Sequence, residues 1–199
     1  ALVAKQGLDI GLKVYTPIVE NMPSGTAIRP GDILHMRNGK TIEVINTDAE
    51  GRLIMADALA FASESKPDII CDVATLTGAA YVALGVEIGA VFSNNKVTLD
   101  SFLNSNNDGF ENYHSLPLEQ SYKSQIKSNI ADMKNSGGRF GGAITAALLL
   151  EEFVDDLNWI HLDIAGPARS RSSNSIYPEG GTGFGVLGYF NFLANEANG

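Results

Sequence analysis

The stretch Asn46-Thr47-Asp48-Ala49-Glu50-Gly51-Arg52 decides the fold, because it places two carboxylates and an arginine in one short turn. Residues 41–45, just before it, are rich in β-branched side chains and predict a strand. Residues 53–62, just after it, are rich in Leu, Met and Ala and predict a buried helix. The acidic pair therefore lies where a strand passes into a helix. In an open α/β sheet, ligands bind at that end of a strand.

The carboxylates of Asp48 and Glu50 can be interpreted in two ways. Carboxylates this close repel each other, so both stay ionised only beside a cation or a positive side chain. Hard divalent metals bind carboxylate oxygens readily, and a two-metal site needs a carboxylate that bridges the ions. Arg52 stays protonated, so it cannot be a ligand but can hold an anion. Alternatively, the stretch is a solvated turn in which Asp48 or Thr47 caps the next helix.

Strands and helices are predicted to alternate along the rest of the chain. Strands are expected over residues 12–18, 32–36, 41–45, 68–74, 86–93 and 158–164. Helices are expected over residues 1–7, 53–62, 79–84, 99–107, 143–154 and 184–194, with a further one near Ser121. Asn38-Gly39 predicts a hairpin between the second and third strands. The pattern predicts an α/β fold in which a mixed, mostly parallel sheet is flanked by helices on both faces.

The strand over residues 68–74 is an apolar run, which is typical of a strand buried on both faces. Cys71, the only cysteine, lies in this run and is expected to be a buried, reduced thiol. The strand ends in Thr75-Leu76-Thr77-Gly78, a second turn at the carboxyl end of a strand. Backbone groups of this turn are candidates for lining a ligand pocket.

Two further stretches carry polar groups that could be functional. In the strand over residues 158–164, alternation places Trp159, His161 and Asp163 on one face. A His and an Asp on one strand face can be catalytic, although such pairs more often have a structural role. The glycine-rich loop over residues 132–142 suggests phosphate binding, but it lacks the Lys and Ser/Thr that end a P-loop.

Composition and charge exclude several classes of protein. The 199 residues are 44% apolar and 19% charged, which is typical of a globular chain that can bury one core. A net charge of -9 argues against binding nucleic acid through its phosphates. No apolar run approaches the length of a membrane span, and no signal-peptide pattern is present. A single domain over residues 1–199 is the simplest organisation, with neither nucleic acid nor membrane as a partner.

The residues from Asn46 to Leu53 resemble the signature of the leucine aminopeptidase family, the cytosolic di-metal exopeptidases. Other segments resemble the same family in the same order along the chain. They are Glu20–Gly25, Arg29–Asp32, Gly39–Thr41, Asp72–Ala79, Gly141–Ala147, His161–Gly166 and Gly181–Val186. The resemblance extends from about Gly11 almost to the C-terminus.

This resemblance implies the fold of the family's C-terminal catalytic domain and a metal-dependent reaction. The implied reaction is release of N-terminal, leucine-like amino acids from peptides with a free N-terminus. Two divalent ions would bind the substrate amine and carbonyl and activate a bridging water. Asp48 and Glu50 would be metal ligands, with Glu50 as the bridge. Zinc is the usual metal of the family, with manganese or magnesium exchangeable at one position.

The resemblance also implies roles for residues around the metals. Bicarbonate would be held by Arg52, Gly51 and Leu76, and would serve as the general base. Backbone groups around Leu76 would stabilise the oxyanion. Substrate-binding roles are implied for Thr75, Leu76, Gly78, Ala165 and Ala168. The two alanines indicate a roomy apolar pocket for the first side chain. The family's enzymes are cytoplasmic homohexamers, so a cytoplasmic homohexamer is expected.

Part of the family's site has no counterpart in this sequence. Family members carry an earlier segment with a metal-binding lysine, metal-binding aspartates and a catalytic lysine. Ahead of Glu20 the only candidates are Lys5, Asp9 and Lys13, and their setting resembles the stretch just past those ligands. The chain begins with Ala1, so an N-terminally truncated catalytic domain is expected.

Two alternative functions remain open at this stage. One is a catalytically incomplete fragment or scaffold subunit of the family, which would bind at most one metal weakly because too few ligands remain. The other is a magnesium-dependent, phosphate-handling enzyme that uses Asp48, Glu50 and the glycine-rich loop. Metal stoichiometry separates the enzyme from the scaffold, and cleavage of leucyl amides separates it from the phosphate enzyme.

Overall fold

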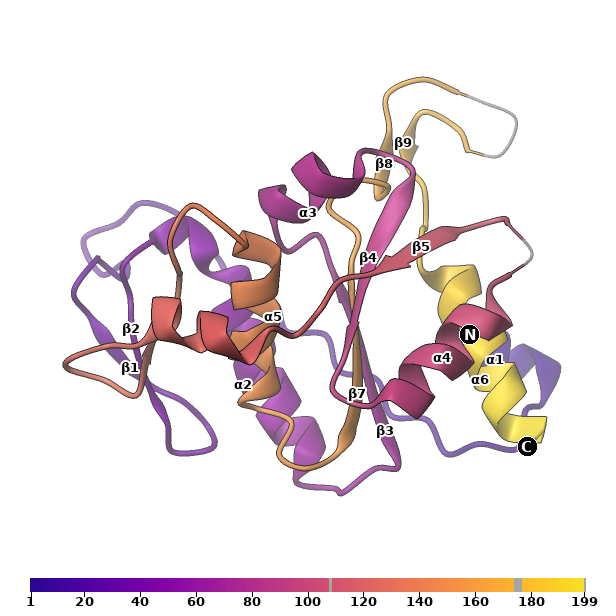
Figure 1. Cartoon of the computed structure of the whole chain (residues 1–199), viewed down its shortest axis with the longest axis horizontal. Coiled ribbons are helices and arrows are strands. Elements are labelled where there is room, and N and C mark those ends of the chain that lie inside the picture. The colour runs from indigo at the N-terminus through magenta and orange to yellow at the C-terminus, as the bar shows by residue number, and fades with distance from the viewer. Residues whose placement is uncertain (108, 174–176, 199) are drawn as a thin grey trace. The chain divides into compact units, whose positions relative to one another are not determined.

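The computed structural model (Figure 1) describes residues 1–107, 109–173 and 177–198. The chain divides into two compact units. Unit 1 comprises Ala1–Val14, Asp72–Leu116 and Ile160–Gly199, and unit 2 comprises Tyr15–Cys71 and Pro117–Trp159. The single domain expected from the sequence stays a prediction.

Unit 2 contains a small mixed sheet in the order β1-β2-β6. The strands β1 (Ile33–His35) and β2 (Thr41–Glu43) are antiparallel, with Leu34 opposite Ile42. Gly39 adopts a positive φ of 87° in the loop that joins them, a conformation that glycine adopts without strain. The hairpin predicted from Asn38-Gly39 is therefore confirmed. The short strand β6 (Met133–Lys134) pairs with β2 in parallel.

Two helices form the core of unit 2. The first, α2 (Gly51–Ser63), packs against α5 (Gly142–Glu151). The burial predicted for each helix from its apolar composition is confirmed. Within α5, seven residues from Ala143 to Leu150 are buried, so nearly the whole helix surface is covered. The 3₁₀ segment η2 (Gln120–Ile126), expected as a helix near Ser121, also contacts α5.

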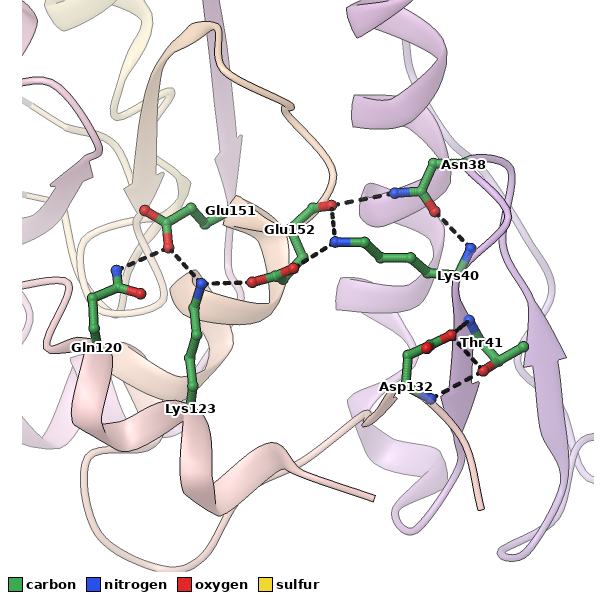
Figure 2. A network of polar contacts seen from close by, with 8 residues as sticks. All are labelled: Asn38, Lys40, Thr41, Gln120, Lys123, Asp132, Glu151 and Glu152. Carbon is green, nitrogen blue, oxygen red and sulfur yellow. Dashed lines mark hydrogen bonds and ion pairs between the residues drawn. The ribbon is translucent and has the colours of Figure 1, made fainter. Parts of the chain in front are cut away.

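A polar network on unit 2 ties the β1–β2 hairpin to the end of α5 (Figure 2). Lys40 and Lys123 approach the Glu152 carboxylate from opposite sides, each with an N···O distance of 2.5 Å. Burial raises the pKa of Glu152, but the hydrogen bonds and charges of the two lysines lower it by more. The pKa of this carboxyl therefore lies below its ordinary value. Nearby, Asp132 accepts hydrogen bonds from the backbone N–H and the hydroxyl of Thr41, both at 2.7 Å.

The larger sheet has the order β3-β7-β4-β5. Its strands are β3 (Ile69–Ala74), β7 (Asn158–Asp163), β4 (Ile88–Ser93) and β5 (Asn112–Ser115). Within unit 1, β4 is antiparallel to β7 and parallel to β5. The predicted α/β class with a mixed sheet is confirmed, although antiparallel pairs have a larger share than expected.

The remaining elements of unit 1 are four helices and two short strands, and an aromatic cluster joins two of the helices. The helices are α1 (Leu2–Gln6), α3 (Gly78–Leu84), α4 (Lys96–Ser105) and α6 (Val186–Asn198), and the short strands are β8 (Arg169–Ser170) and β9 (Gly180–Gly181). Figure 1 shows α4 beside α6, and the buried ring of Phe102 in α4 contacts Phe192 and Tyr189 of α6. The α1, α3, α4 and α6 predictions are confirmed within a few residues.

Two expectations about strands are wrong, and one strand was not predicted. Residues 12–18 form no strand, because their backbone makes no ladder, Pro17 has no N–H to donate, and Ile18 is 87% exposed. The strand β3 is not buried on both faces: it lies at the edge of its sheet, and Val73 is 44% exposed. For the same reason the thiol of Cys71 is only half-buried. The strand β5 was missed, because its sequence Asn112-Tyr113-His114-Ser115 is mostly polar.

None of the helices in the described part of the chain has the length and apolar character needed to cross a membrane.

Candidate functional site

The acidic stretch forms a tight turn between β2 and α2 in unit 2. Residues Thr47–Ala49 make one 3₁₀ turn, η1, whose first residue follows Asn46. The side-chain oxygen of Asn46 caps this turn by accepting from the N–H of Asp48 at 3.0 Å. Glu50 precedes the first residue of α2 and makes no capping hydrogen bond with its side chain. The alternative in which Asp48 or Thr47 caps α2 is therefore wrong.

The charged side chains of this turn differ in their exposure. Asp48 is exposed and Glu50 is half-buried, so both carboxylates are reachable from solvent. Ala49 between them is 7% exposed and fixes the turn against the core. Gly51 and Arg52 begin α2, and Arg52 is 8% exposed. An arginine buried this far keeps its charge, and a helix N-terminus adds positive potential nearby.

A buried asparagine that the sequence reasoning missed supports this turn. Asn135, directly after β6, accepts hydrogen bonds from the N–H groups of Ile45 and Asn46 at 2.9 and 3.2 Å. Its amide nitrogen donates to the carbonyl oxygen of Asn46 at 2.6 Å. The glycines of the loop over residues 132–142 suggest phosphate binding, and they draw attention away from this asparagine. The signal that could have found Asn135 is a lone amide side chain between a strand and those glycines.

The second turn, Thr75-Leu76-Thr77-Gly78, follows β3 in unit 1 and is organised by Asp163. One carboxylate oxygen of Asp163 accepts from the N–H groups of Leu76 and Thr77 at 3.0 and 3.4 Å. The other accepts from the Thr77 hydroxyl at 2.6 Å. Thr75 and Gly78 are exposed and Leu76 is half-buried. Because the N–H of Leu76 is directed at Asp163, an oxyanion role near Leu76 would fall to other groups of this turn.

The turn that follows β7 carries the two alanines predicted to bind substrate. Both Ala165 and Ala168 are half-buried. The N–H of Ala165 donates to Asp163 at 3.2 Å, so one carboxylate organises both turns of unit 1. The N–H of Ala168 donates to the carbonyl of Ile164 at 3.0 Å. Leu76 and Ala165 are thus joined through a common hydrogen-bond acceptor.

His161 has the structural surroundings that are usual for a histidine on a strand face. Its ring is 1% exposed, stacks on Phe92, and its Nδ1 lies 2.5 Å from the Asp72 carboxylate. Burial lowers the pKa of His161, but the charge and hydrogen bond of Asp72 raise it by more, with a smaller contribution from Asp163. The net result is a pKa above its ordinary value. Trp159, expected on the same face, is fully buried as well.

The predicted site residues fall into the two units. Asp48, Glu50, Gly51 and Arg52 lie together in unit 2, within one turn and the start of one helix. Thr75, Leu76, Gly78, Ala165 and Ala168 lie in unit 1. Among the residues that the structure describes, no three His, Cys, Asp or Glu side chains gather closely enough to hold a metal ion. The carboxylates of Asp48 and Glu50 are oxygen donors of the kind that suit a hard divalent cation.

The fold and this turn define a class: an α/β protein that presents a pair of carboxylates where a strand passes into a helix. Comparison with known proteins specifies the class further. Residues 1–188 match the catalytic domain of the cytosol aminopeptidase family. The chain belongs to this family.

Sequence relatives agree with this assignment. The chain is 50% identical over 189 residues to a protein named "Probable cytosol aminopeptidase" from Syntrophotalea carbinolica, covering 95% of this chain and 38% of that protein. It is 48% identical over 195 residues to a protein of the same name from Prochlorococcus marinus (strain MIT 9215), covering 98% of this chain and 39% of the relative. The chain therefore spans well under half the length of the relatives that it matches.

Solved structures give the same result for the fold. A tomato leucine aminopeptidase mutant superimposes with a TM-score of 0.82 at 44% identity, covering 87% of this chain and 34% of that one. The bottromycin maturation enzyme BotP in complex with Mn superimposes with a TM-score of 0.86 at 39% identity, covering 90% of this chain and 41% of that one. The predicted partial catalytic domain of the leucine aminopeptidase fold is thus confirmed.

Proposed function

We propose that this chain is part of a di-metal aminopeptidase that releases leucine-like N-terminal amino acids from peptides with a free N-terminus. The observation that carries the proposal is the turn at residues 46–52, with its two accessible carboxylates beside a buried arginine. Family membership and the manganese complex of a relative support a divalent metal as the cofactor. The alternative of a phosphate-handling enzyme gains no support, because the glycine-rich loop directs Asn135 inward at the acidic turn.

In this proposal the acidic turn supplies the metal ligands of the chain. Asp48 would bind through an exposed carboxylate, and Glu50, half-buried at the start of α2, would be shared between two ions. When bound, divalent ions supply an activated water and a positive charge for the substrate carbonyl. Zinc is proposed as the usual ion, with manganese or magnesium at one position.

Arg52 would hold an anion, bicarbonate in this proposal, which would supply a general base. Its burial at the first turn of a helix favours such a role, because a buried guanidinium attracts an anion more strongly than an exposed one. Backbone N–H groups of Gly51 and Leu76 are proposed as further donors to the anion. For Leu76, this requires its N–H to be shared with Asp163.

The two turns of unit 1 are proposed to bind the substrate. Thr75 and Gly78 offer exposed backbone groups to a peptide main chain, and Leu76 adds an apolar contact. Ala165 and Ala168 have short side chains that leave space for a leucine-sized residue. The complete protein is proposed to be a cytoplasmic homohexamer.

The proposal is tested by replacing the carboxylates in the full-length protein. Asp48→Ala and Glu50→Ala are each expected to abolish hydrolysis of leucyl amides while circular dichroism stays unchanged. The matched control is Asp156→Ala, since Asp156 is an exposed aspartate of the same unit, and it should keep full activity. Near-normal turnover of either site variant with excess manganese would contradict the assignment.

A second candidate function is a catalytically incomplete subunit of the same family. It is favoured by one observation, that the described residues contribute only two carboxylates and no third ligand close to them. Metal analysis of the purified full-length protein separates the two candidates. Two tightly bound ions per chain support the enzyme, whereas none, or one weak ion, supports the incomplete subunit.

A further inference from the structure

We propose that Asn135 is a positioning residue that sets the geometry of the Asp48–Glu50 turn and thereby its affinity for divalent metal. This inference rests on the proposed function, because it assigns a role toward the same metal ligands. Asn135 itself does not touch the carboxylates: its contacts are with the backbone that carries them.

The sheet of unit 2 fixes the position of Asn135. It follows β6, which runs parallel to β2 with Glu43 opposite Lys134, and its own N–H donates to the carbonyl of Glu43 at 2.9 Å. The paired bonds between Thr41 and Asp132 hold the other end of β6 against β2 (Figure 2). The backbone of Asn135 is therefore tied to the strand that leads into the acidic turn.

The side-chain amide of Asn135 is fully buried and faces the turn with both of its ends. Its oxygen accepts from two successive N–H groups, those of Ile45 and Asn46. Its nitrogen donates to the carbonyl of Asn46 at 2.6 Å and more weakly to that of Ala49 at 3.5 Å. One side chain thus satisfies backbone donors and acceptors at the entrance and in the middle of the turn.

These contacts lie on both sides of Asp48 along the chain, and the last of them directly precedes Glu50. The carbonyl of Ala49 accepts a hydrogen bond from Asn135, and Ala49 lies between Asp48 and Glu50. Both carboxylates therefore project from a backbone that this amide fixes. Metal ions require their ligands at narrowly defined positions, and groups that orient the ligands affect affinity nearly as much as the ligands do. Loosening the turn should therefore weaken metal binding without removing a ligand.

The chemistry of the position requires an amide. Aspartate has the same shape, but its carboxylate cannot donate to the carbonyls of Asn46 and Ala49, and two acceptors would then face each other. It would also add a third negative charge beside the turn. Asn135→Asp therefore tests the donor function, and Asn135→Ala removes all side-chain bonds without adding charge.

The experiment measures Mn²⁺ binding by calorimetry on metal-free, full-length protein. Asn135→Asp and Asn135→Ala are expected to raise the Kd for Mn²⁺ by about 10- to 100-fold. Hydrogen exchange should show lost protection at the N–H groups of Ile45 and Asn46. The matched control is Asn106→Asp, since Asn106 is also a buried asparagine whose amide donates to two carbonyls, those of Phe102 and Gly188. This control should lose stability but keep its Kd for Mn²⁺.

Each outcome decides the inference. An unchanged Kd in Asn135→Ala, with activity and metal binding intact in the wild type, overturns the positioning role and leaves the proposed function standing. An equal loss of affinity in Asn106→Asp shows a general effect of destabilisation and also overturns it. A wild-type protein that binds no Mn²⁺ and cleaves no leucyl amide overturns both proposals. If neither Asn135 variant folds, exchange in the wild type decides: slow exchange at Ile45 and Asn46 supports the role, and fast exchange contradicts it.

Discussion

Two turns of this chain, one in each unit, are each held by a buried polar side chain, but the two side chains differ in chemistry. The turn at residues 45–49 is held by the neutral amide of Asn135, and the turn at residues 76–77 by the carboxylate of Asp163. Both anchors are at most 1% exposed, and both come from the end of a strand distant in sequence. What differs is the set of groups that each turn directs at its anchor.

The difference follows from hydrogen-bond chemistry and charge. The acidic turn presents N–H groups and carbonyls together, so only a side chain that both accepts and donates satisfies it. The turn after β3 presents N–H groups and a hydroxyl, all donors, which suit an ionised carboxylate. A charged anchor is tolerated where the turn is neutral, and a neutral anchor is used where the turn already carries two charges. The anchor thus complements the charge of the turn that it supports.

The largest expected effect comes from neutralising the charged anchor. Asp163→Asn places an amide nitrogen among three N–H groups and a hydroxyl, so at least one donor is left without an acceptor. We expect the free energy of unfolding in urea to fall by about 3 kcal/mol. Asp100→Asn is the control, since Asp100 lies on the surface of α4 in a pair with Lys96, and it should change stability by less than about 0.5 kcal/mol. Equal stability of Asp163→Asn and wild type would contradict the anchoring role of the Asp163 carboxylate.

A smaller loss is expected when the donor is removed and the anchor is kept. Thr77 donates to Asp163 and also caps α3, where its hydroxyl accepts from the N–H of Ala80 at 3.0 Å. Thr77→Val keeps the shape but loses both bonds, and should cost about 2 kcal/mol in thermal or urea unfolding. Thr77→Ser keeps the hydroxyl and should recover most of this loss. If serine and valine cost the same, the hydroxyl has no anchoring role.

The charge of Asp163 should also be detectable two residues away, at His161. The pKa of His161 is raised mainly by Asp72, with Asp163 as a minor cause, so Asp163→Asn should move that pKa down toward its ordinary value of 6.5. NMR titration of the imidazole measures this shift. Asn135→Asp, in the other unit, serves as the control and should leave the titration unchanged.

The same histidine predicts the sign of a pH dependence. A pKa raised in the folded state stabilises the protein fully below about pH 6.5, and this stabilisation is lost as the pH rises through the folded-state pKa. The free energy of unfolding should therefore fall over that range, and Asp72→Asn should flatten the profile. A wild-type profile that rises over the same range would contradict the ion pair.

The smallest effect is expected at the half-exposed network of unit 2. It measures how much ion pairs contribute to the free energy of unfolding when they are not fully buried. Glu152→Gln removes the carboxylate shared by Lys40 and Lys123, and should cost no more than about 1 kcal/mol at pH 7. Because the pKa of Glu152 is lowered in the folded state, its contribution exists above about pH 4.5 and disappears as the pH falls through the folded-state value. Unfolding at pH 7 and in acid measures the difference, with the exposed Glu20→Gln as control.

The sequence predicted those parts of the fold and site that local patterns encode. The strand–turn–helix around Asp48 and Glu50 follows from the change in composition at residues 41–62. The family follows from the sequence of the stretch Asn46–Leu53. The side-chain alternation of residues 158–164 placed His161 and Asp163 on one face correctly. Their partners, Asp72 and the turn at Leu76, are about 90 residues away in sequence, and no local pattern shows such a pairing.

The failures have the same physical origin. Residues 12–18 have strand composition, but a strand forms only when a neighbour completes its hydrogen bonds, and composition does not show a neighbour. The polar strand Asn112–Ser115 shows the converse, because pairing with β4 imposes a strand on a weak sequence. Asn135 was missed because its role depends entirely on the parallel pairing of β6 with β2.

One contact beside the turn that follows β7 restricts which sequences can adopt this fold. A Cβ at Gly166 would lie 1.9 Å from the carbonyl oxygen of Gly85, and Gly85 itself has φ 76° and ψ −151°, a region that only glycine occupies readily. Neither position can accept even alanine without moving backbone. In a saturation library of this chain, every substitution at position 85 or 166 should therefore be depleted. A substitution at one of the two positions should not rescue a substitution at the other. Ala165 is thus followed directly by a position that tolerates no side chain.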